Sequence, residues 1–314
     1  MAANIQKMIV VPVDGSQNAM KALDYVDLMF GSRHHLTVSL VYMLQRLPQV
    51  IVEESKKNQD TRRELERIEK RNIQMAEKLL GESKERLMKV GFTTETVEAV
   101  FHKIKVGVAR DICAWAEHKQ ADAIMVSFRG KSRLEAFFLG EVAAKILEYS
   151  RICPVWMVKG AVRDKDVLLA VDSSENAIRA VDHAGFMLSG TGRRLTIFHS
   201  KRDLKRFIAK EVIDEFPEFQ RFWRHKAGEV IAPYVQKAKE ILLAAGIEES
   251  QIDIKVVDGS RNSADDILQA AREVGAGTIM MGLKGSSDVK EYQMGTITRK
   301  VLTQAAEMTI GIVP

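Results

Sequence analysis

Cysteine is nearly absent from this 314-residue sequence, which contains only Cys113 and Cys153. Two cysteines so far apart supply neither a disulfide framework nor the closely spaced ligand pairs of a zinc site. The sequence also lacks an apolar run of about 18 residues that could cross a bilayer. Residues 1–7 lack the basic segment and apolar run of a secretory signal. We therefore expect a reduced, cytoplasmic protein that does not enter a membrane.

Aromatic residues make up only 6% of the chain, and its seven histidines show no metal-ligand spacing. No Ser-His-Asp or Cys-His arrangement can be recognised, so we expect no catalytic residue and no metal site. The net charge is +5, but most basic residues alternate with acids, as in residues 64–71. We interpret the most basic cluster, at residues 201–210, as helix surface, because no nucleic-acid-binding motif accompanies it. We therefore expect no nucleic-acid partner.

What the sequence does contain is an internal duplication. Residues 8–19 match residues 166–177 at an offset of 158: an apolar run ends in Val-Asp, and Ser and Asn-Ala follow at matching positions. Residues 123–130 match residues 278–285 at an offset of 155. Two separate blocks with nearly one offset indicate a duplicated domain.

Each half is predicted to contain the same order of elements, with strands alternating with helices. The predicted strands are 7–13, 36–42, 94–100, 121–126 and 154–158, and then 166–171, 194–199, 251–257, 277–281 and 309–313. Short apolar runs separated by helical patterns indicate buried, parallel strands in doubly wound sheets. We place the first domain at residues 1–160 and the second at 161–314, with a linker at 160–164.

A candidate phosphate-binding loop follows the fourth strand of the second half. It reads Gly282-x2-Gly285-x9-Gly295-Thr296, and Asp172 ends the neighbouring first strand. Glycines let the backbone approach a phosphate closely, and a helix beginning at Thr296 would offer amide groups and a partial positive charge. Three glycines that serve turns alone would give the same spacing, so the pattern leaves both interpretations open.

These residues together resemble the universal stress protein family over nearly the whole chain. Residues 9–16 resemble the family's first strand and turn, and residues 153–155 resemble the entry to its last strand. The loop matches the Gly-x2-Gly-x9-Gly-[Ser/Thr] pattern of the family's ATP-binding members without departure. The resemblance implies two adenine-nucleotide α-hydrolase-like domains whose last strands pair, forming a pseudo-dimer within one chain.

The first half departs from the family pattern at two of four positions. The aligned residues are Ser127, Gly130, Gly140 and Glu141. Ser127 adds a side chain where glycine is expected, and the Glu141 carboxylate would itself satisfy the helix dipole and repel a phosphate. We expect the first half to be a degenerate site that binds ATP weakly or not at all.

The resemblance implies that the second half binds ATP, with or without Mg²⁺, as a regulatory or structural ligand in a stress response. Asp172 would contact the nucleoside, while Gly282, Gly285, Gly295 and Thr296 would hold the phosphates. Two alternatives remain, a slow ATPase and a nucleotide-free interaction scaffold. A homodimer and an unidentified protein partner also remain open.

Two variable helical stretches carry apolar residues outside these motifs. Phe207, Phe216, Phe219, Phe222 and Trp223 could form a lid or partner surface, but we favour satellite core packing. The stretch containing Leu65, Ile68, Met75, Leu79 and Leu80 has helical spacing and is predicted to be a packing face.

Overall fold

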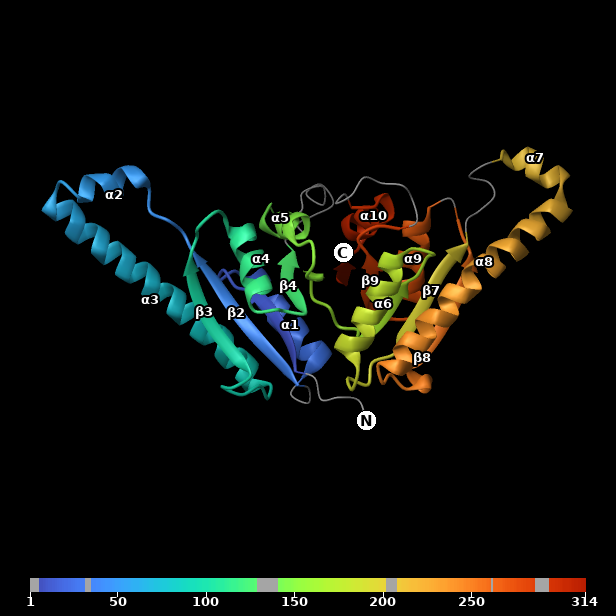
Figure 1. Cartoon of the computed structure of the whole chain (residues 1–314), viewed down its shortest axis with the longest axis horizontal. Helices are drawn as coiled ribbons and strands as arrows, with labels where there is room; N and C mark the ends of the chain where they lie inside the picture. Colours follow the sequence, from blue (N-terminus) through green and yellow to red (C-terminus); the bar gives the residue numbers. More distant parts are fainter. Residues whose placement is uncertain (1–5, 32–34, 129–140, 202–207, 261, 286–293) are drawn as a thin grey trace.

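The computed structural model describes residues 6–31, 35–128, 141–201, 208–260, 262–285 and 294–314 (Figure 1). Its first-half strands are β1 (Lys7–Pro12), β2 (Leu36–Leu44), β3 (Val97–Lys103), β4 (Ala123–Phe128) and β5 (Val155–Lys159). The second-half strands are β6 (Asp166–Ala170), β7 (Leu195–Lys201), β8 (Ile252–Asp258), β9 (Ala276–Gly282) and β10 (Thr309–Val313).

The helices alternate with these strands in both halves. In the first half they are α1 (Gln17–Phe30), α2 (Gln49–Ser55), α3 (Gln59–Lys89), α4 (Val108–His118) and α5 (Glu141–Tyr149). In the second half they are α6 (Glu175–Leu188), α7 (Lys210–Glu215), α8 (Pro217–Ala244), α9 (Ser263–Glu273) and α10 (Thr296–Gln304), with a short 3₁₀ turn η2 (Glu249–Gln251).

The described strands form one sheet in the order β3-β2-β1-β4-β5-β10-β9-β6-β7-β8. Neighbouring strands within each half are parallel, whereas β5 and β10 are antiparallel at the centre. Val158 lies opposite Thr309, and Val155 lies opposite Ile312. The predicted α/β fold is therefore confirmed, as is the pairing of the two last strands into a pseudo-dimer within one chain.

Alternating apolar residues bury both faces of this sheet. Ile9 and Val11 face a core under α1, α3, α6 and α8, whereas Val10 faces a second core under α4, α5, α9 and α10. Both cores contain residues of the two halves, so the sheet is covered continuously across its centre. Strands that are apolar on both faces are typical of parallel sheets covered by helices.

The repeated serines cap equivalent helices. The Ser16 hydroxyl accepts a hydrogen bond from the Ala19 amide at the start of α1, and Ser174 accepts one from Ala177 at the start of α6, both at 3.2 Å. Each contact satisfies one amide that has no partner inside the helix.

Several predicted boundaries are displaced by a few residues. Strand β3 was expected from residue 94, but it begins at Val97 because residues 93–96 form a turn. In that turn the Thr96 amide donates to the Thr93 carbonyl at 3.2 Å. Gly282 is the last residue of β9 rather than the first residue of the following loop.

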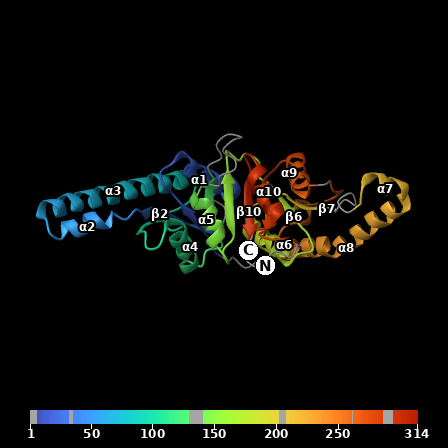
Figure 2. The same cartoon turned by 90° about the horizontal axis from the view of Figure 1, so that it is seen from above.

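Helices α3 and α8 extend beyond opposite edges of the sheet as two arms, with α2 and α7 at their tips (Figures 1 and 2). At 1.5 Å per residue, the 31-residue α3 is about 46 Å long, while the nine-residue β2 spans about 30 Å. The outer part of α3 therefore has no sheet to cover. The expectation of a packing face is wrong there, since Ile68 is 46% and Met75 50% exposed.

The aromatic residues of the second arm are also exposed. Phe216, Phe219 and Phe222 are 57%, 46% and 53% exposed, so the expectation of satellite core packing is wrong for them. Trp223 is partly buried, and Phe207 lies outside the described residues. The interpretation of residues 201–210 as helix surface is wrong for Lys201, which ends strand β7.

Among the described residues, no helix is both long and apolar enough to cross a membrane.

Candidate nucleotide site of the second half

The predicted site residues meet at the carboxyl ends of β6 and β9. These strands are parallel neighbours, and the chain continues from β6 to β7 on one side but returns to β9 on the other. This reversal is a topological switch point, the place where open parallel sheets bind ligands. Asp172 follows β6 by two residues, and Gly282 ends β9.

Asp172 and Ser174 connect the end of β6 to the glycine loop. The Asp172 carboxylate accepts hydrogen bonds from the Ser174 amide, at 3.0 Å, and from the Ser174 hydroxyl. The same hydroxyl lies 3.5 Å from the carbonyl oxygen of Lys284. The carboxylate is therefore held in place against the loop that carries Gly285.

Gly282 and Gly285 occupy positions without room for a side chain. A Cβ atom on Gly282 would lie 2.7 Å from the Asn176 Cβ and 2.8 Å from the Asn176 carbonyl carbon. A Cβ atom on Gly285 would lie 2.6 Å from the Asp172 Oδ2 atom. These two glycines thus permit the end of β9 to pack closely on the start of α6, and the following loop to pack closely on Asp172.

Helix α10 begins at the other end of the loop. Gly295 is its N-cap, and the Gly295 amide donates to the Leu283 carbonyl at 2.9 Å, which closes the loop on itself. Thr296 is the first helical residue and is exposed. No acidic residue lies in the first turn of α10. An anion can therefore bind there, because the first amides of the helix are free to donate hydrogen bonds and the positive end of the helix dipole attracts it.

Sequence reasoning missed three residues that build this site. Ser174 and Asn176 contact the loop as described, and their repetition in the first half was the available indication. The Thr298 hydroxyl donates to the Gly282 carbonyl at 3.0 Å and is buried. No sequence pattern pointed to Thr298, because its contact joins two residues that are sixteen positions apart in the chain.

Two residues of the next strand flank the site. His199 Nδ1 donates to the Val171 carbonyl at 2.7 Å, so this ring nitrogen is bound to the segment that follows β6. The Ser200 hydroxyl donates to Asp266 at 2.6 Å, and Asp266 also accepts from the Ser260 amide at 3.0 Å. These bonds join the end of β7, and Ser260 after β8, to Asp266 of α9.

The first half has the same turn but different chemistry at its helix. Asp14 accepts from the Ser16 amide at 2.9 Å, as Asp172 does from Ser174. Ser127 lies in β4, and Glu141 is the first residue of α5, while Gly130 and Gly140 lie outside the described residues.

The Glu141 carboxylate forms an ion pair with the Lys145 ammonium. The two residues are one helical turn apart, and hydrogen bonding to the Lys145 ammonium lowers the pKa of Glu141. The first turn of α5 therefore carries a negative charge at the place where α10 has none.

Within the described part of the chain, no group of three or more His, Cys, Asp or Glu residues is arranged to hold a metal ion. Burial raises the pKa of both Cys113 and Cys153 to about 12, so neither thiol is activated.

Comparisons with known proteins agree with this architecture. The model of the universal stress protein family matches residues 6–159 and 165–309. Universal stress protein MJ0531 of Methanocaldococcus jannaschii is 30% identical over 158 residues, which are 50% of this chain and 84% of that protein. Universal stress protein YxiE of Bacillus subtilis is 24% identical over 144 residues, 43% of this chain and 89% of that protein.

Solved structures match the whole tandem arrangement. The crystal structure of a universal stress protein from Archaeoglobus fulgidus has a TM-score of 0.63 at 21% identity, with 98% of both chains covered. A functionally unknown protein, PA1789 from Pseudomonas aeruginosa, has a TM-score of 0.55 at 14% identity, covering 99% of this chain and 93% of its own. These likenesses show the fold, and the family match extends over both halves: the chain belongs to the universal stress protein family.

Proposed function

We propose that the second half binds ATP as a regulatory or structural ligand. The observation that carries this proposal is the convergence of Asp172, Gly282, Gly285, Gly295 and Thr296 at one switch point, where β6 and β9 end and α10 begins. The residues fit the ligand, because a helix N-terminus without an acidic first turn adjoins a loop whose glycines bring its backbone close to the Asp172 carboxylate.

Each residue has a distinct role in this proposal. Asp172 would accept hydrogen bonds from the ribose or the base, since its carboxylate is already oriented by Ser174. The amides of the loop and of the first turn of α10 would hold the phosphates, and the Thr296 hydroxyl would add one hydrogen bond. Mg²⁺ would arrive with the nucleotide rather than occupy a protein site of its own.

We propose that the first half binds ATP weakly or not at all. Glu141 occupies the position of Thr296, so a phosphate on α5 would meet a carboxylate instead of a hydroxyl. Like-charge repulsion between that carboxylate and a phosphate would weaken binding. Lys145 neutralises only part of it, because both side chains are solvent-exposed.

The sharpest test exchanges the residue that differs between the halves. Thr296→Glu places an acid at an exposed helix start, where the dipole stabilises it, so the variant should fold as the parent does. Thermal unfolding is measured with and without Mg-ATP. At a hundredfold excess over Kd, bound ATP stabilises the parent by about 2.7 kcal/mol, and we expect Thr296→Glu to lose most of that shift.

Gln59→Glu is the matched control, because it adds the same charge to the first residue of α3 on the distant arm. It should keep the full response to Mg-ATP. An equal response in Thr296→Glu and in the parent would reject the second-half site.

We also propose a division into domains at residues 1–160 and 161–314, on the sequence repeat, and a cytoplasmic location, on the near absence of cysteine. A nucleotide-free scaffold remains the second candidate function, and one observation favours it: the exposed rings of Phe216, Phe219 and Phe222 on the arm formed by α8. A homodimer or another protein partner could cover such rings. Retention of partner binding by Thr296→Glu would separate this function from ATP binding.

A further inference from the structure

Among the described strands, β8 is the last one at the second-half end of the sheet. It pairs in parallel with β7 on one side, from Ile252 opposite Leu195 to Asp258 opposite Lys201. An edge strand presents amide and carbonyl groups to which another chain can add a strand. Proline residues and bulges commonly block such edges, but β8 contains no proline and its register with β7 runs without a shift.

The backbone of β8 directs every second residue toward this open edge. The Gly259 amide donates to the Lys201 carbonyl of β7 at 2.9 Å, so the odd-numbered residues of β8 face β7. Successive residues of a strand point their amides and carbonyls to opposite sides, so those of Ile254 and Val256 face outward. Ile252 presents only its carbonyl there, because its amide donates within η2.

Apolar side chains of this edge are exposed in the second half but covered in the first. Ile254 is 48% and Val256 41% exposed. By register they correspond to Ala99 and Phe101 of β3, which pack against the core under α3. Contact with another strand would remove the two exposed side chains from water, which is favourable.

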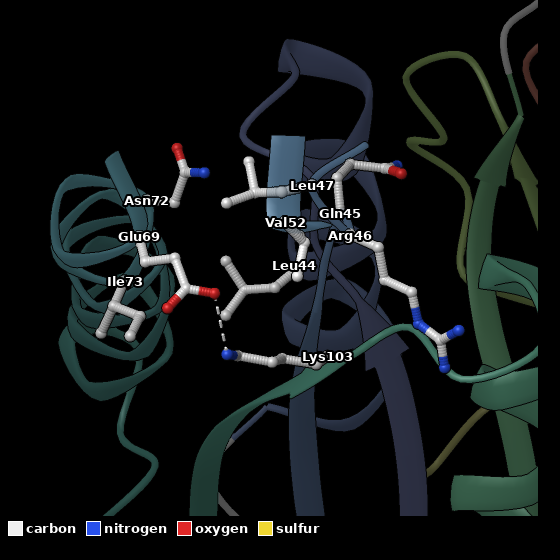
Figure 3. A pocket seen from close by; sticks show the side chains of 9 residues that line it. All are labelled: Leu44, Gln45, Arg46, Leu47, Val52, Glu69, Asn72, Ile73 and Lys103. Atoms are coloured by element: carbon white, nitrogen blue, oxygen red, sulfur yellow. Dashed lines mark hydrogen bonds and ion pairs between the residues drawn. The ribbon is translucent and has the colours of Figure 1, made fainter. Parts of the chain in front are cut away.

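Helix α3 lies along the first-half edge strand as far as its end. Lys103, the last residue of β3, pairs with Glu69 of α3 at 3.2 Å (Figure 3). Beside this pair a slot of about 200 Å³ is lined by Leu44, Val52 and Ile73, among others (Figure 3). The helix thus covers, in the first half, the side chains that are exposed at the second-half edge.

The sequence of β8 is self-complementary about Ile254. When two copies of the strand lie antiparallel with Ile254 opposite itself, Ile252 lies opposite Val256 and Asp253 lies opposite Lys255. The outward groups of the two Ile254 residues then exchange hydrogen bonds, and each Ile252 carbonyl accepts from a Val256 amide. A pairing centred on Lys255 would instead place like charges directly opposite each other, which is unfavourable.

The ion pairs at this edge also fit such a contact. Asp253 pairs with Arg194 at 2.8 Å, and Lys255 pairs with Glu273 at 2.6 Å. Placing Asp253 of one copy beside Lys255 of the other joins these two pairs into a row of four alternating charges. The twofold axis repeats the row, and a network of this kind contributes more than isolated exposed pairs do.

From these features we propose that the chain forms a homodimer through β8. The two sheets join edge to edge across a twofold axis at Ile254, and the partner is therefore a second copy of this chain. This contact differs from the β5–β10 junction, which joins the two halves within one chain.

Sedimentation equilibrium of the full chain at a series of concentrations tests the proposal. The average mass is expected to rise from 35.2 kDa toward twice that value. Asp253→Lys places two lysines opposite each other at both ends of the contact, so it should weaken the dimer roughly tenfold or more. The double variant Asp253→Lys with Lys255→Asp exchanges the charges and should recover most of that loss.

Ile254→Pro removes the central outward amide but takes no hydrogen bond from the ladder with β7, so the chain should fold and stay monomeric. Ala99→Pro is the matched control, because Ala99 is the equivalent residue of the other edge strand. It should leave the dimer unchanged, and circular dichroism checks that each variant folds.

A parent that stays monomeric at every concentration would overturn the proposal. The same holds for Ile254→Pro that dimerises as the parent does, or for equal dissociation constants of Asp253→Lys and the double variant. Dimers should persist in Thr296→Glu, so failure of the nucleotide site and failure of this interface are distinguishable.

Discussion

Gly282 and Gly295 belong to one sequence motif, but the space around their Cα atoms differs. A Cβ atom on Gly282 would meet the backbone and Cβ of Asn176 at 2.7 to 3.0 Å. The nearest atom to a Cβ on Gly295 is the Leu283 carbonyl oxygen at 3.5 Å, an ordinary contact distance. The first glycine is therefore required by the fold itself, whereas the second leaves room that a ligand could use.

We predict that Gly282→Ala lowers the free energy of unfolding by about 1–3 kcal/mol, because backbone atoms of Asn176 cannot move aside as a flexible side chain can. Gly295→Ala should change it by less than about 1 kcal/mol. Urea unfolding without nucleotide measures both. Equal losses in the two variants would mean that the contact with Asn176 does not limit packing.

At the scale of elements, each half caps a helix of the other. The Lys7 ammonium, at the start of β1, donates to the carbonyls of Met187 and Ser189 at the end of α6, at 3.2 and 3.1 Å. The Arg193 guanidinium donates to the carbonyls of Leu28, at 2.7 Å, and Met29 at the end of α1. Burial lowers the pKa of both cations, but the helix carbonyls supply partners and a favourable dipole.

Arg193→Met is expected to reduce the free energy of unfolding of the full chain by about 1–3 kcal/mol, since it leaves partly buried carbonyls without donors. The adjacent Arg194→Met is its control. Arg194 pairs with Asp253 at 2.8 Å on the surface, and removing that exposed pair should cost less than about 1 kcal/mol. Denaturant titration compares them, and a larger loss for Arg194→Met would contradict the capping role.

At the scale of the whole molecule, polar contacts join the halves inside one of the two cores. Trp156 of β5 is fully buried, and its Nε1 donates to the His183 Nε2 of α6 at 2.9 Å. The Tyr25 hydroxyl of α1 bonds to the Thr278 hydroxyl of β9 at 2.7 Å. These contacts restrict how the two halves can pack, because a displacement would leave buried polar atoms without partners.

The contact between Trp156 and His183 predicts a pH dependence of stability. Burial lowers the pKa of His183 from 6.5 to about 3, so the unfolded chain binds a proton that the folded protein excludes. This contribution is complete above pH 6.5 and is lost as the pH falls toward 3. Between pH 7 and 4.5 we expect a loss of about 2–3 kcal/mol from this residue.

Urea unfolding across this pH range measures the effect, with His183→Gln as the control. Glutamine keeps a neutral acceptor for Trp156 but binds no proton in this range, so its stability should depend less on pH. A variant with the same slope as the parent would show that other groups, such as carboxylates, cause the acid sensitivity.

The local patterns of the sequence determined the order of elements and the turns that begin helices. Apolar runs and their spacing predicted the strands, and the offset of 158 identified the duplication, whose matching blocks contain the cap residues Ser16 and Ser174. These features depend on residues close together in the chain, or on a repeat within it, so they can be read without coordinates. The glycine spacing likewise identified Gly282, Gly285 and Gly295, although their function stays a proposal.

Contacts between distant segments were decided only by the tertiary structure. Three features depend on which segments become neighbours and on how far a helix extends beyond its sheet. They are the packing of Gly282 on Asn176, the exposure of Phe216 and Phe219, and the slot beside Ile73. Periodicity tells which face of a helix is apolar, but it does not tell whether another surface is there to cover it. Only the packed chain settles that, because burial is a property of neighbours in space.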